Sequence, residues 1–458
     1  MVLKSGGVHF KEVSQMNSRW NILKPFEDKN EYMNDRIATG IEAHRKGFAF
    51  VKVVDEKGDP VRDARIRVIQ KSHDFKYGAN LFMLDEIPDS PEKNILYRKY
   101  FAEAFNTATI PFYWDTLEPE QGKPRYGKDS PRIYRRPAPD LCLEFCEENA
   151  IEPKAHCLNY AAFMPSWAKG SLQWEKQCLE KRFRELSERY AKRIPTWEVT
   201  NESYWGSRNL SSLYMQDDFV EWSFALAENC FPSNHLMINE SGARIWDWTW
   251  FHFNRSAYYM QIERALHNGA RIDSIGMQYH MFYRREDEAK ETAVYYDPEQ
   301  LYAVMDTYAK LGRPLQITEL TIPAYSDSPE DEQIQAQIIE NIYSIFFSHP
   351  AMDGIIYWNV PSGYAHGTVP GDMTSGENYY YGGLLRFDMT PRKAYNVIRD
   401  LFGKKWRTVL ELHTDPSGSF SFKGFYGKYD LEITSGSGKI CRTLHLRNDL
   451  KKHFTITL

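Results

Sequence analysis

The spacing of hydrophobic and polar positions divides the chain into three parts. Residues 47–70 and 407–458 alternate apolar and polar positions over short runs, with Gly, Ser and Pro turns between the runs. This alternation is typical of half-buried strands. From about residue 73 to 404, short apolar runs alternate instead with amphipathic stretches at helical spacing. The pattern therefore predicts β-rich segments at both ends of a large α/β region.

The central region contains eight short apolar runs, most of which end at a polar or charged residue. These candidate strands are 76–82, 106–110, 152–156, 195–202, 235–240, 273–280, 314–319 and 353–359. Examples of the expected helices are 91–105, 177–192 and 329–347. Eight strand–helix units over about 330 residues match the number and size of a (β/α)8 TIM barrel. A doubly wound open sheet would also alternate, but the chain has no G-x-G-x-x-G or P-loop first turn. We therefore predict the α/β class with a (β/α)8 TIM barrel.

The two β-rich ends resemble the halves of one small module. Residues 47–70 hold two alternating strands around the turn Lys57-Gly58-Asp59-Pro60, a pattern that predicts a hairpin. Together with "GSFSFKGFYGKYDLEITSGSGK" near the C-terminus, they resemble the small β-sandwich found beside carboxypeptidases and many bacterial glycan-processing proteins. The expected domains are an N-terminal segment (1–45), an accessory β-sandwich split in sequence (46–72 plus 405–458) and the barrel (73–404). The sandwich is expected either to brace the barrel or to bind glycan.

Composition removes several classes of function. The formal net charge of the 458 residues is -5, so there is no electrostatic case for a nucleic-acid partner. The six cysteines form no C-x-x-C pair, and the chain has no H-x-H or H-E-x-x-H motif, so we expect neither a metal nor another cofactor. Cys142 and Cys146 are expected to be free buried thiols. Aromatic residues reach 15%, a surplus that suits a carbohydrate cleft, although most of these rings are expected in the core.

The first ten residues, "MVLKSGGVHF", contain no apolar signal-peptide core. No later segment is long and apolar enough to span a bilayer, so we expect no membrane partner. The protein is expected to be secreted or periplasmic if a signal peptide has been removed, and cytoplasmic otherwise. The sequence carries no information on the oligomeric state.

Polar residues at the carboxyl ends of barrel strands converge on one mouth, although they lie far apart in sequence. The strand-end residues expected to converge there are His156, Asn201, Glu202, Asn239, Glu240, Gln278, His280, Glu319 and Trp358. Among them, Glu202 ends the fourth candidate strand and Glu319 the seventh, on roughly opposite sides of the mouth. Glycoside hydrolysis requires two carboxyl groups that flank one bond. The pattern therefore predicts Glu202 and Glu319 as a catalytic pair.

Three further strand-end residues fit the same chemistry. His280 is placed to hydrogen-bond the nucleophile, Asn201 to hold a sugar 2-hydroxyl, and Trp358 to floor the cleft. Taken singly, a strand-end Glu is more often a surface or salt-bridged residue, a His in a Q-x-H string more often a structural hydrogen bonder, and a Trp in an apolar strand more often core. Their coincidence at the strand ends of one barrel pattern is what favours a site.

Six motifs, in the same order, resemble glycoside hydrolase family 10, the xylanase family of retaining (β/α)8 enzymes. The match covers about residues 77–404, and the motifs are "YWDTLEPEQGK", "AHCLNYAAFMPSW", "WEVTNE", "GMQYH", "QITEL" and "GLLRFDMTPRKAY". The resemblance assigns the acid/base role to Glu202 and the nucleophile role to Glu319. It also implies that Asn201, His156, Gln278, His280 and Trp358 shape the subsite beside the cleaved bond.

The chain departs from the family pattern where the family grips the sugar on the glycone side. The Glu, Asn and Lys of the family's E-N-x-M-K correspond to Thr109, Ile110 and Tyr113, and the V-W-H segment to Asn159, Tyr160 and Ala161. The last loop reads "SGYAHGTVPGDMTSGENYYYGG" and lacks the family's S-W-R. Loss of a hydrogen-bond partner for a sugar hydroxyl penalises the standard substrate. We therefore expect altered glycone subsites.

We predict that the protein is a retaining glycoside hydrolase that cleaves a β-linked plant-type polysaccharide or oligosaccharide. The activity we expect first is endo-1,4-β-xylanase activity on xylan. The alternatives are an exo-acting or side-chain-tolerant β-glycosidase on a different glycan and a non-catalytic carbohydrate-binding protein on the same barrel. A metal-dependent hydrolase ranks last. Further aromatic residues expected to contact substrate are Tyr113, Tyr160, Tyr204 and Trp205, with Trp246, Trp248, Trp250, Tyr283 and Tyr296 as candidate stacking platforms and Tyr364 and His366 as weaker ones.

Overall fold

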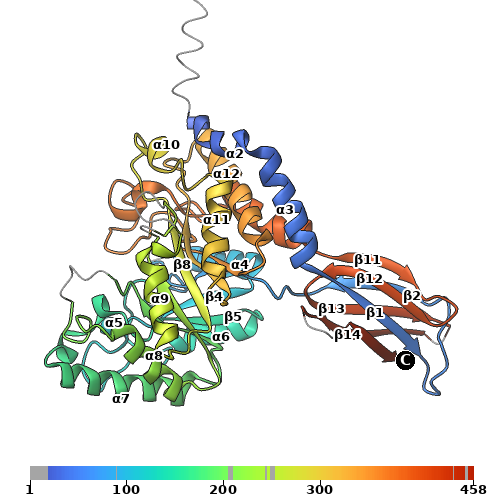
Figure 1. The fold of residues 1–458 in the computed structure, drawn as a ribbon, viewed down its shortest axis with the longest axis horizontal. Helices are drawn as coiled ribbons and strands as arrows, with labels where there is room; N and C mark the ends of the chain where they lie inside the picture. Colours follow the sequence, from blue (N-terminus) through green and yellow to red (C-terminus); the bar gives the residue numbers. More distant parts are fainter. Residues whose placement is uncertain are drawn as a thin grey trace, which may run out of the picture.

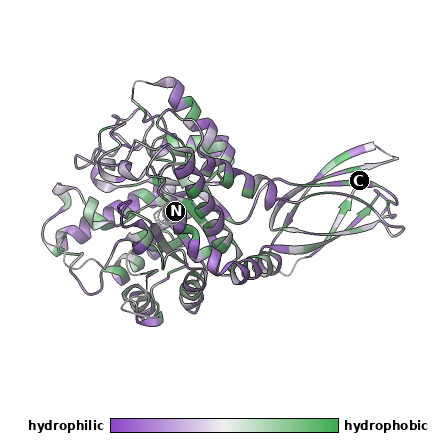
Figure 2. Cartoon of the chain, turned by 90° about the horizontal axis from the view of Figure 1, so that it is seen from above, coloured by the Kyte–Doolittle hydropathy of each residue, from purple (hydrophilic) through white to green (hydrophobic). Residues whose placement is uncertain are grey.

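The computed structural model shows a large α/β lobe joined to a smaller lobe of two mainly antiparallel sheets (Figure 1). It describes residues 19–88, 90–204, 210–242, 245–247, 253–436, 438–448 and 452–458. Viewed from above, the two lobes lie side by side, and the C-terminus lies in the smaller one (Figure 2).

The large lobe is a closed parallel barrel in the strand order β10-β3-β4-β5-β6-β7-β8-β9. Its strands are β3 (Lys76–Asn80), β4 (Thr107–Pro111), β5 (Glu152–His156), β6 (Thr196–Asn201), β7 (His235–Glu240), β8 (Ser274–His280), β9 (Leu315–Thr321) and β10 (Met352–Tyr357). The predicted (β/α)8 fold is confirmed, and every predicted strand overlaps one of these eight. Most of their residues are buried, as expected for strands covered by helices on one side and filled by side chains on the other.

Helices surround the barrel. They are α4 (Pro91–Ala104), α5 (Trp114–Leu117), α6 (Pro139–Glu148), α7 (Leu172–Tyr190), α8 (Phe219–Cys230), α9 (Ala257–His267), α10 (Glu288–Glu291), α11 (Pro298–Ala309), α12 (Pro329–Ser348) and α13 (Lys393–Asp400). Several of these helices begin with a capping residue that is followed by a proline. The side chains of Ser90, Asp297 and Ser328 each accept a backbone N–H of the first turn, and a proline comes next. Such caps satisfy otherwise unpaired amides and set the first helical dihedral.

The segment before the first strand packs on the barrel. It contains η1 (Arg19–Leu23), α2 (Lys24–Asp28) and α3 (Asn30–His44). Arg19 forms buried ion pairs with Glu288 of α10 and Asp331 of α12, and α3 lies against α12. These contacts tie the N-terminal segment to the helical shell.

The smaller lobe joins strands from both ends of the chain in two sheets. A three-stranded sheet has the order β12-β1-β15 and a four-stranded sheet the order β11-β2-β13-β14. The strands are β1 (Lys46–Val54), β2 (Arg65–Gln70), β11 (Val409–His413), β12 (Ser419–Phe425), β13 (Gly427–Ser435), β14 (Gly438–Leu446) and β15 (His453–Thr457). A separate hydrophobic cluster fills the space between the sheets, including Val51, Ile66, Val68, Leu431 and Leu446.

The predicted hairpin between the first two strands is wrong. The chain does turn after β1, where Val61 donates its N–H to the carbonyl of Val53. However, β1 and β2 lie in different sheets. Both edges of β1 are paired with β12 and β15, and both edges of β2 with β11 and β13. Strands from the end of the chain therefore occupy the positions that a local hairpin would have used.

The cysteines are all free, and Cys142 and Cys146 are buried in α6 as expected. Within the described part of the chain, none of the helices combines the length and apolar character needed to cross a bilayer.

Candidate active site

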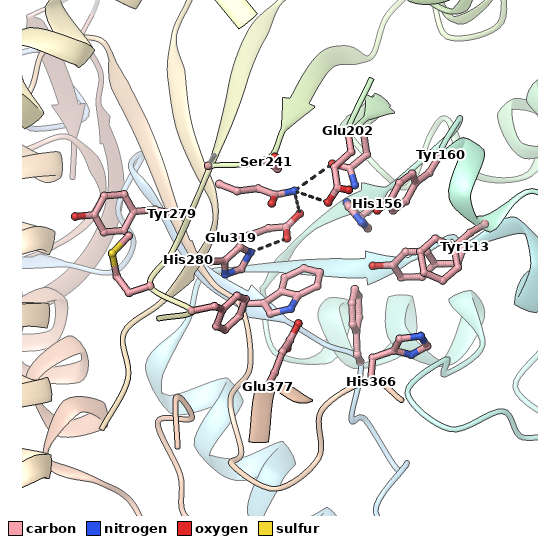
Figure 3. Close-up of a pocket in the computed structure, with 18 of the residues that line it drawn as sticks. Tyr113, His156, Tyr160, Glu202, Ser241, Tyr279, His280, Glu319, His366 and Glu377 are labelled. Atoms are coloured by element: carbon pink, nitrogen blue, oxygen red, sulfur yellow. Dashed lines mark hydrogen bonds and ion pairs between the residues drawn. The ribbon is translucent and has the colours of Figure 1, made fainter. Parts of the chain in front are cut away.

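A cavity of about 480 Å³ opens at the carboxyl ends of the barrel strands. Residues from the ends of β5, β6, β8 and β9 line it, together with residues from the segments that follow the barrel strands (Figure 3). Among the predicted site residues, those that line it are Tyr113, His156, Tyr160, Asn201, Glu202, Gln278, His280, Glu319 and Trp358. The barrel thus brings together in one cavity side chains that are more than two hundred residues apart in sequence.

Irregularities in two strands precede the two carboxylates. In β6, the pairing with β7 shifts between Glu198 and Thr200, and Glu202 follows with φ +50°. In β9, the pairing with β8 shifts immediately before Glu319. An extra residue re-aims the side chains that follow it. A left-handed conformation is unfavourable for a residue with a Cβ and is held by its surroundings, here by hydrogen bonds from the Glu202 N–H to the Asn239 carbonyl (3.3 Å) and from Tyr214 Oη to the Glu202 carbonyl (3.0 Å).

The two carboxylates share one amide nitrogen. Nε2 of Gln278 lies 3.5 Å from Oε1 of Glu202 and 3.2 Å from Oε1 of Glu319 (Figure 3). Carboxyl groups about 5–5.5 Å apart suit a retaining glycosidase, while an inverting enzyme needs about 6.5–9.5 Å to admit a water. Because one nitrogen lies within reach of both carboxyl groups, the geometry favours the shorter separation, which is that of a retaining enzyme.

Glu319 is held by three donors. Its Oε1 accepts from Asn239 Nδ2 (3.1 Å) as well as from Gln278, and its Oε2 lies 3.2 Å from Nε2 of His280. Asn239 is itself oriented, because its Oδ1 accepts from Thr318 and its Nδ2 also reaches Oδ1 of Asn201 at 2.9 Å. The chain therefore fixes the orientation of the Glu319 carboxylate before any ligand binds.

Asn239 fits beside Thr318 because the neighbouring strand has a glycine. A Cβ added at Gly276 of β8 would lie 2.7 Å from Oδ1 of Asn239 and 2.7 Å from Cγ2 of Thr318. Any larger residue would push the hydrogen-bonded pair apart. The small residue below the cavity thus protects the orientation of Glu319.

A buried ionic cluster lies beneath the carboxylates. Glu198 of β6 contacts Nζ of Lys154 through one oxygen and Nδ1 of His156 through the other. All three side chains are buried. Burial by itself would raise the pKa of Glu198, but the charges and hydrogen bonds of Lys154 and His156 lower it to about 2. Glu198 is therefore ionised, and it fixes the ring of His156 at the cavity wall.

Burial has the opposite net effect on Glu319. It raises the pKa of this carboxyl to about 8, and the charges of Glu198 and Glu202 act in the same direction, against His156 and Lys154. The three donors around Glu319 hydrogen-bond its ionised form and oppose this rise. Burial lowers the pKa of His280 to about 4, so its ring is neutral at pH 7.

Aromatic rings form part of the cavity wall. Trp358, Phe82 and Tyr113 make a separate buried cluster, against which Tyr160 packs. The ring of Trp358 lies edge-on to His156 and His280, at centroid distances of 6.0 and 5.9 Å. Apolar walls with a few convergent polar groups are typical of sites for small molecules and sugars.

Not every predicted contact residue lies in the cavity. Tyr204 is absent from its lining and places its Oη 3.4 Å from the carbonyl of Ser241, so its contact with substrate stays a prediction. Trp205, Trp248 and Trp250 lie outside the described residues. Trp246 and Tyr283 line the cavity, but Trp246 is fully buried and donates Nε1–H to the carbonyl of Gln278. Tyr296 and Tyr364 are also buried, whereas His366 lines the cavity.

Sequence reasoning missed other lining residues. The additional ones include Phe82, Arg135, Arg136, Phe163, Phe282 and Glu377. Arg135 and Arg136 lie in the long connection between α5 and α6, and Glu377 in the short 3-10 helix η5 (Gly376–Tyr380) after β10. Neither segment has a periodic pattern that could have signalled its role.

A closed barrel with two adjacent carboxylates at its mouth defines the class of barrel glycoside hydrolases. The family model "Glycosyl hydrolase family 10" matches residues 83–400. The chain belongs to this family.

The curated relatives are distant, and several of them bear xylanase names. "Endo-1,4-beta-xylanase B" of Thermotoga neapolitana is 25% identical over 345 residues, covering 72% of this chain and 88% of the relative. "Anti-sigma-I factor RsgI6" of Acetivibrio thermocellus is 24% identical over 422 residues, covering 90% of this chain and 48% of the relative. The chain thus spans about half the length of that relative. The structure of xylanase 10B from Thermotoga petrophila in complex with xylobiose matches with a TM-score of 0.55 and 20% identity, over 72% of this chain and 95% of that one.

Proposed function

We propose that the protein is a retaining glycoside hydrolase acting on a β-linked plant-type polysaccharide or oligosaccharide, with endo-1,4-β-xylanase-like activity. The observation that carries the proposal is the pair Glu202 and Glu319, which share Nε2 of Gln278 in one cavity at the barrel mouth. Membership of glycosyl hydrolase family 10 and the names of xylanase relatives support the choice of substrate.

The reaction requires a protonated Glu202 and an ionised Glu319. In the first step, the Glu319 carboxylate attacks the anomeric carbon while Glu202 donates its proton to the glycosidic oxygen, so the aglycone leaves as an alcohol. In the second step, the Glu202 carboxylate takes a proton from water, and the oxygen of this water attacks the anomeric carbon and releases Glu319. Two displacements retain the configuration, and the pair ends with the proton on Glu202 again.

The neighbours position the two groups and the sugar. Asn239, Gln278 and His280 hold the nucleophile through the bonds described above. Asn201, whose Oδ1 accepts from Asn239, is placed to bind a sugar 2-hydroxyl, a contact that strengthens in the transition state. His156 and Trp358 form the wall against which the sugar beside the cleaved bond would lie.

Turnover of an activated aryl β-glycoside tests the proposal. The Glu319→Ala variant should lose turnover while its circular dichroism spectrum and Tm show a folded protein. Gln337→Ala on the distant helix α12 is the control and should keep wild-type activity. Near wild-type turnover by the Glu319→Ala variant would refute the assignment.

An exo-acting enzyme on another glycan is the second candidate. It is favoured by the loop after β10, which brings His366 and Glu377 into the cavity lining in place of the family's S-W-R motif. A loop that closes one end of the cavity would restrict the number of sugars bound there. Product analysis over a polysaccharide panel decides, because an endo enzyme yields a ladder of oligosaccharides and an exo enzyme one small sugar.

The smaller lobe is proposed to act as an accessory β-sandwich that braces the barrel. Phe425 of β12 belongs to the hydrophobic core of the barrel and lies 6.1 Å from the ring of Phe347 in α12. Arg45, immediately before β1, donates to the carbonyls of Phe347, His349 and Met352. A module attached through core packing and buried hydrogen bonds is suited to supporting the barrel.

A further inference from the structure

Two adjacent arginines line the cavity although both side chains are buried. Arg135 is 2% exposed and Arg136 is 5% exposed. The guanidinium carbon of Arg136 lies 3.9 Å from the centroid of the Tyr113 ring and 5.7 Å from that of Phe163. The two cations thus belong to the aromatic wall of the cavity that also contains Tyr113.

Neither guanidinium forms an ion pair with a carboxylate among the described residues. Arg135 donates from Nη1 to the carbonyl of Tyr364 and from Nη2 to Oδ1 of Asn359 at 2.9 Å, both neutral acceptors. Arg136 donates from Nη1 to the carbonyl of Arg135 at 3.0 Å. The Nε atoms of both residues are buried with no hydrogen-bond partner in this part of the chain. Arg136 therefore keeps the Nε–Nη2 edge, which can grip a carboxylate with two parallel bonds, free of any bond to the described residues.

Burying an unpaired cation costs free energy, and the lowered pKa of Arg136 reflects this cost. Burial lowers the pKa of Arg136 to about 10, the charge of Arg135 adds to the effect, and Tyr113 and Asp115 oppose it. Asp115 acts only from a distance, since no ion pair links it to Arg136. A ligand anion would relieve this cost, because an ionic hydrogen bond is strongest where water is excluded.

We propose that Arg136, with the adjacent Arg135 adding positive charge, binds the carboxylate of a uronic acid in the substrate, either as a branch or as a residue of the glycone. The proposal rests on the glycosidase function above and names its substrate class. His366 lies on the same side, where Arg135 and Arg136 both act on its titration. Glu377 also lines the cavity, but one of its oxygens accepts from Nδ2 of Asn359 at 2.7 Å, and Oδ1 of the same amide accepts from Arg135.

A carboxylate fits this site better than a sulfate ester. The side-on edge of a guanidinium matches the two coplanar oxygens of a carboxylate. Phe163, a half-buried ring whose centroid lies 5.7 Å from the guanidinium carbon of Arg136, lines the same cavity and offers apolar contact to the sugar that carries the acid. A neutral sugar would bring no counter-ion, so the free-energy cost of burying the Arg136 cation would remain.

The test compares a linear β-1,4-xylo-oligosaccharide with the same backbone carrying a glucuronic acid branch. We expect the wild-type protein to prefer the acidic substrate in kcat/KM by on the order of tenfold or more, as one charge-assisted bond allows. Arg136→Gln should abolish this preference, and Arg136→Lys, which keeps the charge but loses the paired donors, should reduce it. The control Arg132→Gln, a half-exposed arginine paired with Glu86, should keep the wild-type ratio.

A measurement of oligosaccharide binding distinguishes a failure of this carboxylate site from a failure of the proposed hydrolase function. If neither substrate is hydrolysed, calorimetry with the same two oligosaccharides still decides. Tighter binding of the acidic one, lost in Arg136→Gln, supports the site, and equal affinities overturn it. An unchanged preference in Arg136→Gln, or a stronger preference for a sulfated oligosaccharide, also overturns the carboxylate assignment. If Arg136→Gln is unfolded by circular dichroism, the ratio measured for Arg136→Lys decides in the same way.

Discussion

Replacement of Glu319 by glutamine should make the protein more stable at alkaline pH than the wild type. Burial and neighbouring carboxylates raise the pKa of Glu319 from 4.5 in the unfolded chain to about 8 in the fold. Below pH 4.5 both states carry the proton, and the folded state has no disadvantage. As the pH rises from 4.5 to about 8, the unfolded state ionises first and the wild type loses stability. Glutamine does not titrate, so the variant is spared this loss.

The size of the effect follows from the same values. Each pH unit between the two pKa values costs about 1.4 kcal/mol, which amounts to about 4–5 kcal/mol at pH 8 and above. The free energy of unfolding of Glu319→Gln, minus that of the wild type, should therefore rise by that order between pH 4.5 and pH 8.5. Chemical denaturation at the two pH values measures it, and other buried acids such as Glu240 cancel in the difference.

Glu198→Gln is the matched control, because its shift has the opposite sign. Lys154 and His156 hold the pKa of Glu198 at about 2, so this carboxylate contributes stability above pH 4.5 that is lost as the pH falls toward 2. Its replacement should therefore cost about 3 kcal/mol at pH 7 and less at pH 3. An equal stability difference between Glu319→Gln and the wild type at pH 4.5 and pH 8.5 would refute the raised pKa of Glu319.

Three further predictions follow from the site and the lobe contact. Glu202→Gln should lose about 10²–10⁴-fold in turnover of unactivated oligosaccharides and much less on an activated aryl glycoside, and equal losses in kcat/KM on both would contradict its role as acid. Lys154→Met should lower the free energy of unfolding by about 3–5 kcal/mol, because it strips a partner from buried Glu198; a change under 1 kcal/mol in urea denaturation would show that Glu198 does not depend on the pair. Phe425→Ala should cost about 3–5 kcal/mol and lower the Tm of the barrel in calorimetry, and an unchanged Tm would rule out bracing.

The strand ends were predictable because a barrel imposes a simple rule. Glu202 and Glu319 each follow an apolar run, and parallel strands of one barrel present their carboxyl ends to one mouth. No further detail of tertiary structure was needed to bring Asn201, Gln278 and His280 to the same place.

The ionic cluster beneath the site could not be predicted in this way. Lys154 and Glu198 lie inside strands, where the sequence pattern shows only charged positions in otherwise apolar runs. Their pairing depends on the register between β5 and β6 and on the irregularity of β6 beside Glu198. Register is a tertiary property, set by neighbours that a local pattern does not contain.

The same limit explains the hairpin error and the missed arginines. The turn after β1 was correctly placed, but strands from the end of the chain pair with both edges of β1. Arg135 and Arg136 lie in a connection with no regular structure, and only the packing against Tyr113 shows that they face the cavity wall.

Covalent trapping of the glycosyl-enzyme intermediate identifies the nucleophile of the reaction. The protein is incubated with a 2-deoxy-2-fluoro β-glycoside that carries a good leaving group, and the labelled peptide is identified by mass spectrometry. The account predicts one sugar attached to Glu319, with the label absent from Glu319→Gln. Turnover of the parent glycoside without any trapped label, or a label on a residue other than Glu319, would contradict it.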